Sequence, residues 1–187
     1  MKDALHHFRT IHPLNEVAEA ALLSIITIRD VPKNEVIQRP GSTCRTLYFI
    51  EDGIARIFYR IEDDEVTEHF AYDGNMIIRA ESLFTGKPTR KGIHAVTDIR
   101  LAMINAQKLF DLFESDHEIE KLFHKVIVRE YVAAIQRAES LQMKTATERY
   151  LELLGATPLL QHVPLKHIAS YLGITQVSLS RIRAGIK

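Results

Sequence analysis

The chain of 187 residues has a single cysteine, Cys44, and no tryptophan. One cysteine excludes a disulfide within the chain and also excludes an iron–sulfur cluster held by four cysteines. No apolar run approaches the length of about 18 residues that a membrane-spanning helix needs. The first residues, MKDALHHFRTIHPL, lack the apolar core of a signal peptide. We therefore expect a cytoplasmic protein.

Net charge of either sign is also absent, so the whole chain favours no charged partner. Residues 1–140 carry 18 Lys and Arg against 22 Asp and Glu, a net charge of −4. Residues 141–187 carry 6 against 2, a net charge of +4. An acidic body with a basic end is typical of a ligand-binding or dimerisation module joined to a nucleic-acid-binding module, although chance clustering produces so small an excess too.

The last 23 residues, Leu165 to Lys187, have the pattern of a helix-turn-helix. Ala169 is a small residue where two helices would cross, and Gly173 tolerates the positive φ of a tight turn. Each short helix has apolar residues on one face: Ile168, Leu172, Ile174, Leu179 and Ile182. We predict that this motif binds DNA in the major groove; an ordinary helical hairpin is the alternative. The expected DNA contacts are Gln176, Ser178, Arg181, Arg183, Lys166 and Lys187.

Residues 14–27 have apolar residues at helical spacing, Leu14, Val17, Ala21 and Ile25, and predict a helix that Asn15 or an earlier residue caps. From Arg29 to about Met103, short runs rich in Val, Ile, Phe and Tyr alternate with turn residues. This pattern indicates an antiparallel sandwich or barrel. The alternation is clearest in one strand, in which Ala55, Ile57 and Tyr59 oppose Arg56, Phe58 and Arg60.

Helical spacing returns at residue 105. We predict a short helix over residues 105–114, a long one over about 116–142, and another over 145–154 that Gly155 and the next three residues end. The long helix has two apolar stripes, one of Ile119, Leu122, Val126 and Ala133, the other of Phe123, Ile127, Ala134 and Leu141. One stripe is expected to pack on the β region and the other on a second copy; a core helix within one chain is the alternative.

In this order, the elements resemble the Crp–Fnr family of bacterial transcription regulators. Pro40-Gly41, the strand Leu47–Ile50, Gly53 and Gly74 look like the family's first hairpin and its glycines. The stretch Ser82–Pro88, SLFTGKP, looks like a sub-group common in Bacteroidetes. The resemblance implies an α+β fold with an antiparallel jelly roll of the cyclic-nucleotide-binding type and a C-terminal helix-turn-helix that lacks a full wing. Its domains would be residues 1–115 for the effector, 116–142 for dimerisation and 143–187 for DNA.

The resemblance implies a homodimer, joined through residues 116–142, that reads a palindromic operator in double-stranded DNA. It aligns Gln176, Ser178 and Arg181 with base-contacting positions, and Arg181 has the donors for guanine O6 and N7. A position that is often Glu in the family is Val177 here, so the operator should differ from the best-known operator sequence of the family. Without a full wing, affinity would depend more on Lys166, His167 and the other cations. RNA polymerase is a further candidate partner. No catalysis is expected, and the operator, the target genes and the direction of regulation stay open.

In family members that bind a cyclic nucleotide, a loop holds the phosphate with Gly-Glu near its start and Arg-Ser or Arg-Thr near its end. Aligned from Gly74, the first pair falls on Ile78-Arg79; aligned back from Gly86 and Ala95, the second falls on Thr89-Arg90. Neither pair is kept, so a cyclic nucleotide in the standard mode is disfavoured against another effector or none. The candidate effector-binding residues are Arg79, Glu81, Thr89 and Arg90, and Glu81 and Arg90 could substitute for the missing pairs if the loop is shifted by a residue or two.

The rival reading is a small-molecule-binding β-roll or a cupin-like enzyme without DNA binding. A cupin needs clustered metal ligands, and the strands offer His69 and His94 with Glu68 and Glu81. Glu68 and His69 are adjacent and should point to opposite faces of a strand, which disfavours the enzyme. Near the start, His6, His7 and His12 are a weak metal signal and are expected to be solvated residues of a helix.

Overall fold

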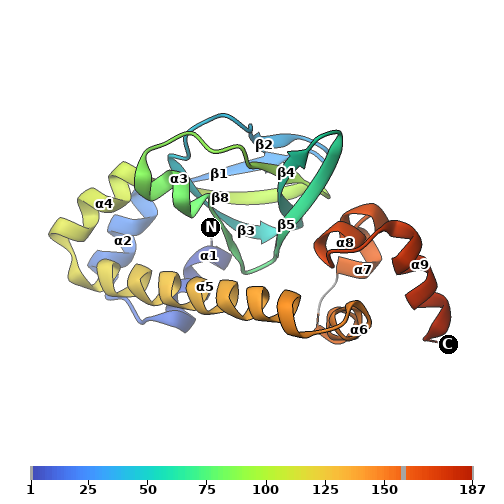
Figure 1. Cartoon of the computed structure of the whole chain (residues 1–187). Helices are drawn as coiled ribbons and strands as arrows, with labels where there is room; N and C mark the ends of the chain where they lie inside the picture. The colour runs from blue at the N-terminus through green and yellow to red at the C-terminus, as the bar shows by residue number, and fades with distance from the viewer. Residues whose placement is uncertain (1, 157–158, 187) are drawn as a thin grey trace.

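The protein, described by a computed structural model for residues 2–156 and 159–186, is an antiparallel β-roll crossed by one long helix (Figure 1). The strands are β1 (Ile26–Val31), β2 (Val36–Gln38), β3 (Thr46–Asp52), β4 (Ile54–Ile61), β5 (Asp64–Tyr72), β6 (Met76–Ile77), β7 (Gly92–Ala95) and β8 (Ile99–Asn105). The helices are α1 (Lys2–Ile11), α2 (Glu16–Ser24), α3 (Ala80–Thr85), α4 (Ala106–Ser115), α5 (His117–Met143), α6 (Ala146–Ala156), α7 (Leu159–His162), α8 (Leu165–Tyr171) and α9 (Gln176–Gly185).

The roll consists of two four-stranded antiparallel sheets, in the orders β1-β8-β3-β6 and β2-β7-β4-β5. Apolar side chains from both sheets meet between them, including Ile50, Ile57, Ile93 and Leu101. The sequence predicts the glycines of the bends correctly, because Gly41, Gly53 and Gly74 all have positive φ. The expected antiparallel β-roll followed by a long helix and C-terminal helices is confirmed.

Strand β4 is buried on both faces from Ile54 to Phe58. The expected alternation is present, since Ala55 and Ile57 belong to the core between the sheets. The opposite face is buried as well, because the C-terminal helices pack over β4 and β5. Arg56 on that face is only 2% exposed.

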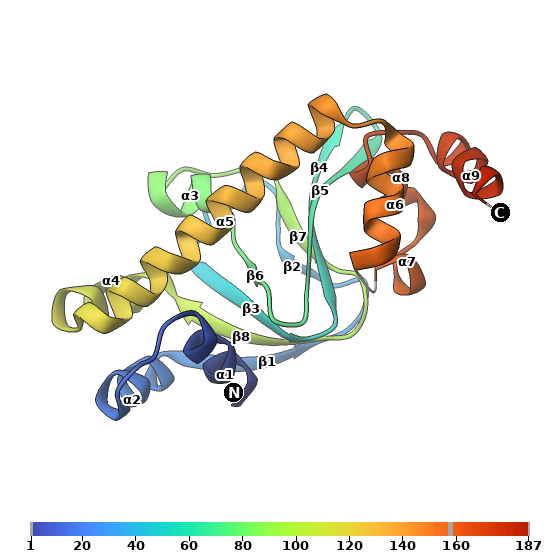
Figure 2. The same ribbon diagram turned by 90° about the horizontal axis from the view of Figure 1, so that it is seen from below.

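Helix α5 lies beneath the roll, with α1, α2 and α4 at its N-terminal end and the C-terminal helices at the other end (Figure 2). At the N-terminal end a second core forms around Phe8. The Phe8 ring lies 5.5 Å from the ring of Phe49 and 5.7 Å from the ring of Phe123. The predicted cap of α2 is confirmed, since Asn15 Oδ1 accepts from Ala18 N at 2.9 Å.

Two expectations for the N-terminal region were wrong. The helix expected over residues 14–27 ends at Ser24, because residues 26 and 27 already pair in β1, and it buries Ala18 and Leu22 whereas Val17 is 76% exposed. His7 of α1 and His12, which follows the end of α1, are not simply solvated: the His7 ring lies 5.1 Å from that of Phe49. His12 Nε2 lies 2.8 Å from Glu118 Oε2 on α5.

The burial of α5 changes along its length rather than between two full-length stripes. Ile119, Leu122, Phe123 and Val126, drawn from both predicted stripes, are buried near its N-terminal end. Beyond them, apolar residues are 41–66% exposed: Ile127, Val128, Tyr131, Val132, Ile135 and Leu141. A core helix buried within one chain is therefore excluded for this second part.

The C-terminal helices follow α5 after a short connection at Lys144. The predicted helix after residue 145 extends slightly further than expected, because α6 includes Gly155 and Ala156. The other two residues of the expected stop, Thr157 and Pro158, lie outside the described residues. Among residues 2–156 and 159–186, none of the helices is both long and apolar enough to cross a membrane.

Candidate functional site

The turn between α8 and α9 has the geometry of a helix-turn-helix. Gly173 has φ of 71° and its N–H donates to Ser170 O at 3.0 Å, while Ile174 N donates to Ala169 O at 3.0 Å. These two bonds are those of a Schellman motif, which stops a helix at a residue with positive φ. Thr175 then caps α9, because its Oγ1 accepts from Ser178 N at 3.2 Å. The local sequence alone therefore specifies where α8 ends and where α9 begins.

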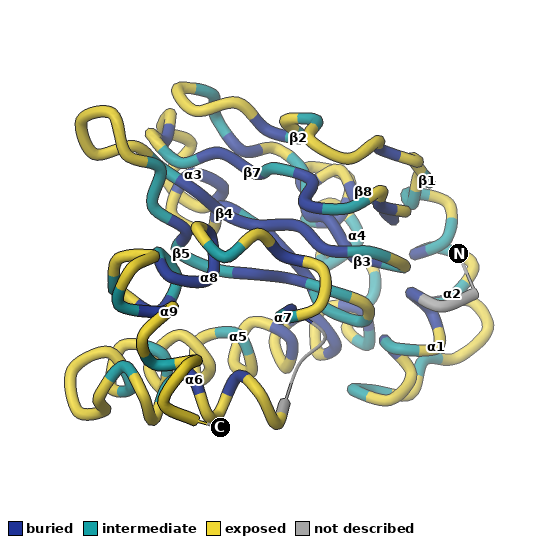
Figure 3. Tube along the Cα trace, turned by 90° about the vertical axis from the view of Figure 1, so that its right-hand side faces the viewer, coloured by how far each residue is buried: buried dark blue, intermediate teal, exposed yellow. Residues whose placement is uncertain are grey.

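Helix α9 exposes most of its length to solvent (Figure 3). Gln176, Arg181 and Arg183 are exposed, and Ser178 is half-buried, with its hydroxyl 3.0 Å from that of Thr175. The buried Leu179 holds the opposite face of the helix against the C-terminal core. The predicted base-contacting side chains thus share a solvent-facing helix.

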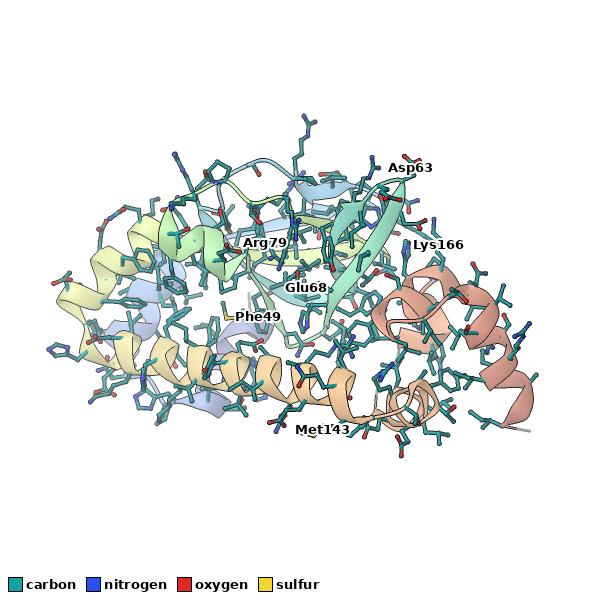
Figure 4. All side chains as sticks on the ribbon, in the orientation of Figure 1. Phe49, Asp63, Glu68, Arg79, Met143 and Lys166 are labelled. Atoms are coloured by element: carbon teal, nitrogen blue, oxygen red, sulfur yellow. The ribbon has the colours of Figure 1, made fainter. Side chains whose placement is uncertain are left out.

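The other predicted DNA contacts are placed differently. Lys166 is exposed, but it projects from α8 near the β-roll (Figure 4), where its charge acts on His94 of β7. His167 was expected to add to the cations that contact DNA, but this expectation was wrong. Its side chain is buried against the roll. Lys187 lies outside the described residues.

Helix α8 packs directly on β5, so the helix-turn-helix shares a core with the roll. Ile54 and Phe70 from the roll meet Ile168, Ala169 and Leu172 from α8 and the turn. The hydroxyl of Ser170 joins the two parts, since it accepts from the amide of Thr67 at 2.8 Å and donates to Glu65 O at 3.4 Å. The position of α8 is thereby tied to the position of β5.

A buried ionic cluster lies beside this contact. The Arg56 guanidinium donates to the Glu65 carboxylate and to Thr67 Oγ1, the latter at 3.1 Å. Burial lowers the pKa of His167 to about 4, and the positive charges of Arg56 and Lys166 act in the same direction. His167 is therefore neutral at pH 7, which lets it pack without a counter-ion.

Two arginines connect the turn to the long helix and to α6. Arg137 of α5 donates to Tyr171 O, and its guanidinium carbon lies 3.8 Å from the centre of the Tyr171 ring. Arg149 of α6 donates to Leu172 O through Nη2 at 2.8 Å. These bonds satisfy carbonyl groups at the C-terminal end of α8, where helix dipoles favour cations.

A cavity of about 950 Å³ lies between the roll, α3, α5 and the helix-turn-helix. Most of its walls are apolar side chains, among them Tyr59, Phe84, Phe110 and Phe113. Ser170, Tyr171 and Gly173 line it from the helix-turn-helix. The same cavity therefore contacts both the roll and the turn that positions α9.

Of the four predicted effector-binding residues, the structure brings two to this cavity. Arg79 and Glu81 line it, with Arg79 buried and Glu81 exposed. Thr89 is buried, and its backbone is hydrogen-bonded to residues 41 and 42. For example, Gly41 N donates to Thr89 O at 2.7 Å. Arg90 is exposed, 5.6 Å from the centre of the Tyr59 ring.

Sequence reasoning missed Glu68 as a cavity residue. Residues 57 and 58 of β4 pair with His69 and Thr67 of β5, so Glu68 is the extra residue of a β-bulge. A bulge interrupts the alternation of side chains and redirects them. Glu68 and His69 consequently both line the cavity, contrary to the expectation that they face opposite sides. Nothing in the local sequence signals the bulge.

A metal centre of the cupin kind has no support in the described part of the chain. Among residues 2–156 and 159–186, no group of three or more His, Cys, Asp or Glu side chains could hold a metal ion. His69 is half-buried, and burial lowers its pKa.

Residues 28–116, just under half of the chain, match the family model of the cyclic nucleotide-binding domain. No protein among the curated sequences matches the chain. The matched segment runs from β1 to the start of α5 and contains the roll together with the loop that carries Arg79.

Solved structures resemble nearly the whole chain at low identity. FixK2 from Bradyrhizobium japonicum is 20% identical with a TM-score of 0.73, over 87% of this chain and 84% of that one. The c-di-GMP responsive global regulator CLP from Xanthomonas campestris is 17% identical with a TM-score of 0.71, over 92% and 91%. The catabolite activator protein of Thermus thermophilus is 19% identical with a TM-score of 0.58, over 96% and 86%. At such identity the likeness shows the fold, that of Crp-like transcription regulators.

Proposed function

We propose that the protein is a cytoplasmic, sequence-specific transcription regulator of the Crp–Fnr type, controlled by a small molecule that binds in the roll. The observation that carries this proposal is the solvent-facing α9 behind a Schellman turn, in a chain with the fold of such regulators. The SLFTGKP stretch at residues 82–88 supports the sub-group common in Bacteroidetes.

Helix α9 is the proposed recognition helix. Exposed Gln176 and Arg181 lie on its surface, and a guanidinium can bind guanine O6 and N7 in the major groove. Val177 is 62% exposed beside them and can pack against a thymine methyl group. Arg183 and the N-terminal end of α9 would contact phosphates.

A homodimer would present two such helices to a palindrome. Val128, Val132 and Ile135 of α5 are 41–46% exposed and lie outside the cavity lining, so they form a surface that a second α5 would cover. Two-fold symmetry would then place the two recognition helices in half-sites about one helical turn of DNA apart.

The effector would act through the contact between α5, the roll and the helix-turn-helix. The cavity touches all three, and Arg137 binds the backbone of the turn from α5. A ligand that prefers one arrangement of these elements would change the spacing of the two recognition helices.

The test is selection from random DNA duplexes at two salt concentrations. We expect enrichment of a palindrome, with affinity that falls steeply as salt rises, because Lys and Arg displace counterions from phosphates. Arg181→Ala should weaken binding to the selected site by about 1–3 kcal/mol and relax the preference at one base pair.

The matched control is Arg39→Ala, which removes an exposed arginine from the loop after β2. It should leave the affinity for the operator unchanged. Equal losses in the two variants would show that binding is unspecific attraction to positive charge, and failure to enrich any sequence with or without effector would refute DNA recognition.

A further inference from the structure

Arg79 is a buried cation with few partners. Its side chain is 5% exposed, and its Nε is buried without a hydrogen-bond partner among the described residues. Its Nη1 lies 3.7 Å from Glu68 Oε2, beyond hydrogen-bond distance. Since a buried guanidinium normally uses its donors, this geometry indicates a place for an anion.

The neighbouring carboxylate does not fill that place. Glu68 Oε1 accepts from Lys91 Nζ at 2.7 Å, and Lys91 thereby draws the carboxylate away from Arg79. Two cations, Arg79 and Lys91, thus lie within 4 Å of one carboxylate, that of Glu68. The carboxylate of Glu81 also acts on Arg79 electrostatically, but among the described residues no group accepts a hydrogen bond from the Arg79 Nε.

The rest of the cavity favours an apolar body for that ligand. Its volume of about 950 Å³ accommodates a small organic molecule, and aromatic rings of Phe84, Phe110 and Phe113 line it near α3 and α4. At the opposite end, Tyr171 and Gly173 of the helix-turn-helix form part of the wall. A molecule that fills the cavity would therefore extend from Arg79 to the turn.

The residue pairs that hold a cyclic nucleotide in the standard mode are not kept here. An arginine stands at position 79, where an acceptor for a ribose hydroxyl would be needed. Thr89, at the position of the expected phosphate-binding arginine, uses its backbone in bonds to residues 41 and 42. Arg90 lies outside the cavity lining.

We propose that the cavity binds an amphipathic organic anion, an aromatic or aliphatic molecule with one carboxylate or sulfonate, and that Arg79 is its counter-ion. Glu68 competes with the ligand for Arg79. The ligand would be the effector only if the proposed regulatory function is correct. Its binding to the cavity does not depend on that function.

The test uses two fluorescent probes that share an aromatic body, 1-anilinonaphthalene-8-sulfonate and the uncharged N-phenyl-1-naphthylamine. Arg79→Met should weaken binding of the sulfonate about tenfold or more and leave the uncharged probe unchanged. Glu68→Gln, which removes the competitor, should strengthen binding of the sulfonate. Because the two substitutions act in opposite directions, loss of folding in one cannot imitate the result.

Matched controls separate this site from general attraction. Arg39→Met and Glu62→Gln make the same charge changes at exposed positions outside the cavity lining and should alter neither probe. Octanoate should displace the sulfonate from the wild type, whereas octanamide should displace it far less. The proposal is overturned if the sulfonate binds equally to all variants, as it would on the exposed part of α5. It is also overturned if cyclic AMP displaces the probe better than octanoate. The probe assays contain no DNA, so neither result decides whether the protein binds DNA.

Discussion

Lowering the pH should loosen the contact between α8 and the roll through one residue, His167. Its folded-state pKa is about 4, against 6.5 when solvated, because burial and the positive charges of Arg56 and Lys166 disfavour the imidazolium. The unfolded or undocked state therefore binds the proton more tightly. The stabilisation is complete above about pH 6.5 and is lost as the pH falls towards 4.

The size of the effect follows from the two pKa values of His167. Their difference of about 2.5 corresponds to about 3 kcal/mol in full, of which about 2 kcal/mol is lost between about pH 7 and about pH 5. Denaturant unfolding of the wild type and of His167→Gln at these two pH values measures it. Glu65 and His94, which face His167 from the roll, titrate in both proteins, so the difference isolates His167.

The wild type should lose about 2 kcal/mol more than His167→Gln over that range. Equal losses in the two proteins would refute the reasoning, because they would mean that His167 is not kept neutral by the contact with β4 and β5. A larger loss in the variant would refute it also.

Three further substitutions test the glycine bends and the dimer. Gly53→Ala should cost about 3 kcal/mol or more by denaturant unfolding, because a Cβ would lie 2.3 Å from Asp98 O at a φ of +95°. Gly173→Ala should cost only about 1–2 kcal/mol, since its φ is also positive but the Cβ would meet Leu141 at an ordinary 3.6 Å. Equal costs would contradict this distinction. Ile135→Glu, on the exposed part of α5, should convert a dimer to a monomer in sedimentation; an unchanged mass would place the dimer contact elsewhere.

The helix boundaries could be predicted because they depend on neighbouring residues. Asn105 and Asp116 accept from backbone amides two or three residues ahead, at the starts of α4 and α5. Gly173 and Thr175 stop α8 and start α9 in the same local way. Such signals need no tertiary contact, so the sequence contains them in full.

The site depended on contacts between distant segments. Glu68 faces the cavity because of a bulge whose register is set by pairing with β4. Arg79 is buried at the start of α3, whereas Arg90, in the same basic stretch, stays exposed. Residue type alone did not separate these two arginines.

Local patterns in the sequence thus determined the long helix, most strands and the C-terminal helix-turn-helix, but not the short helices α3 and α7. Only the tertiary structure decided which charged groups are buried, because burial depends on what another part of the chain places over them. Arg56 and His167 illustrate this point: each looked solvated in its own element, and each is buried by packing of α8 against the roll.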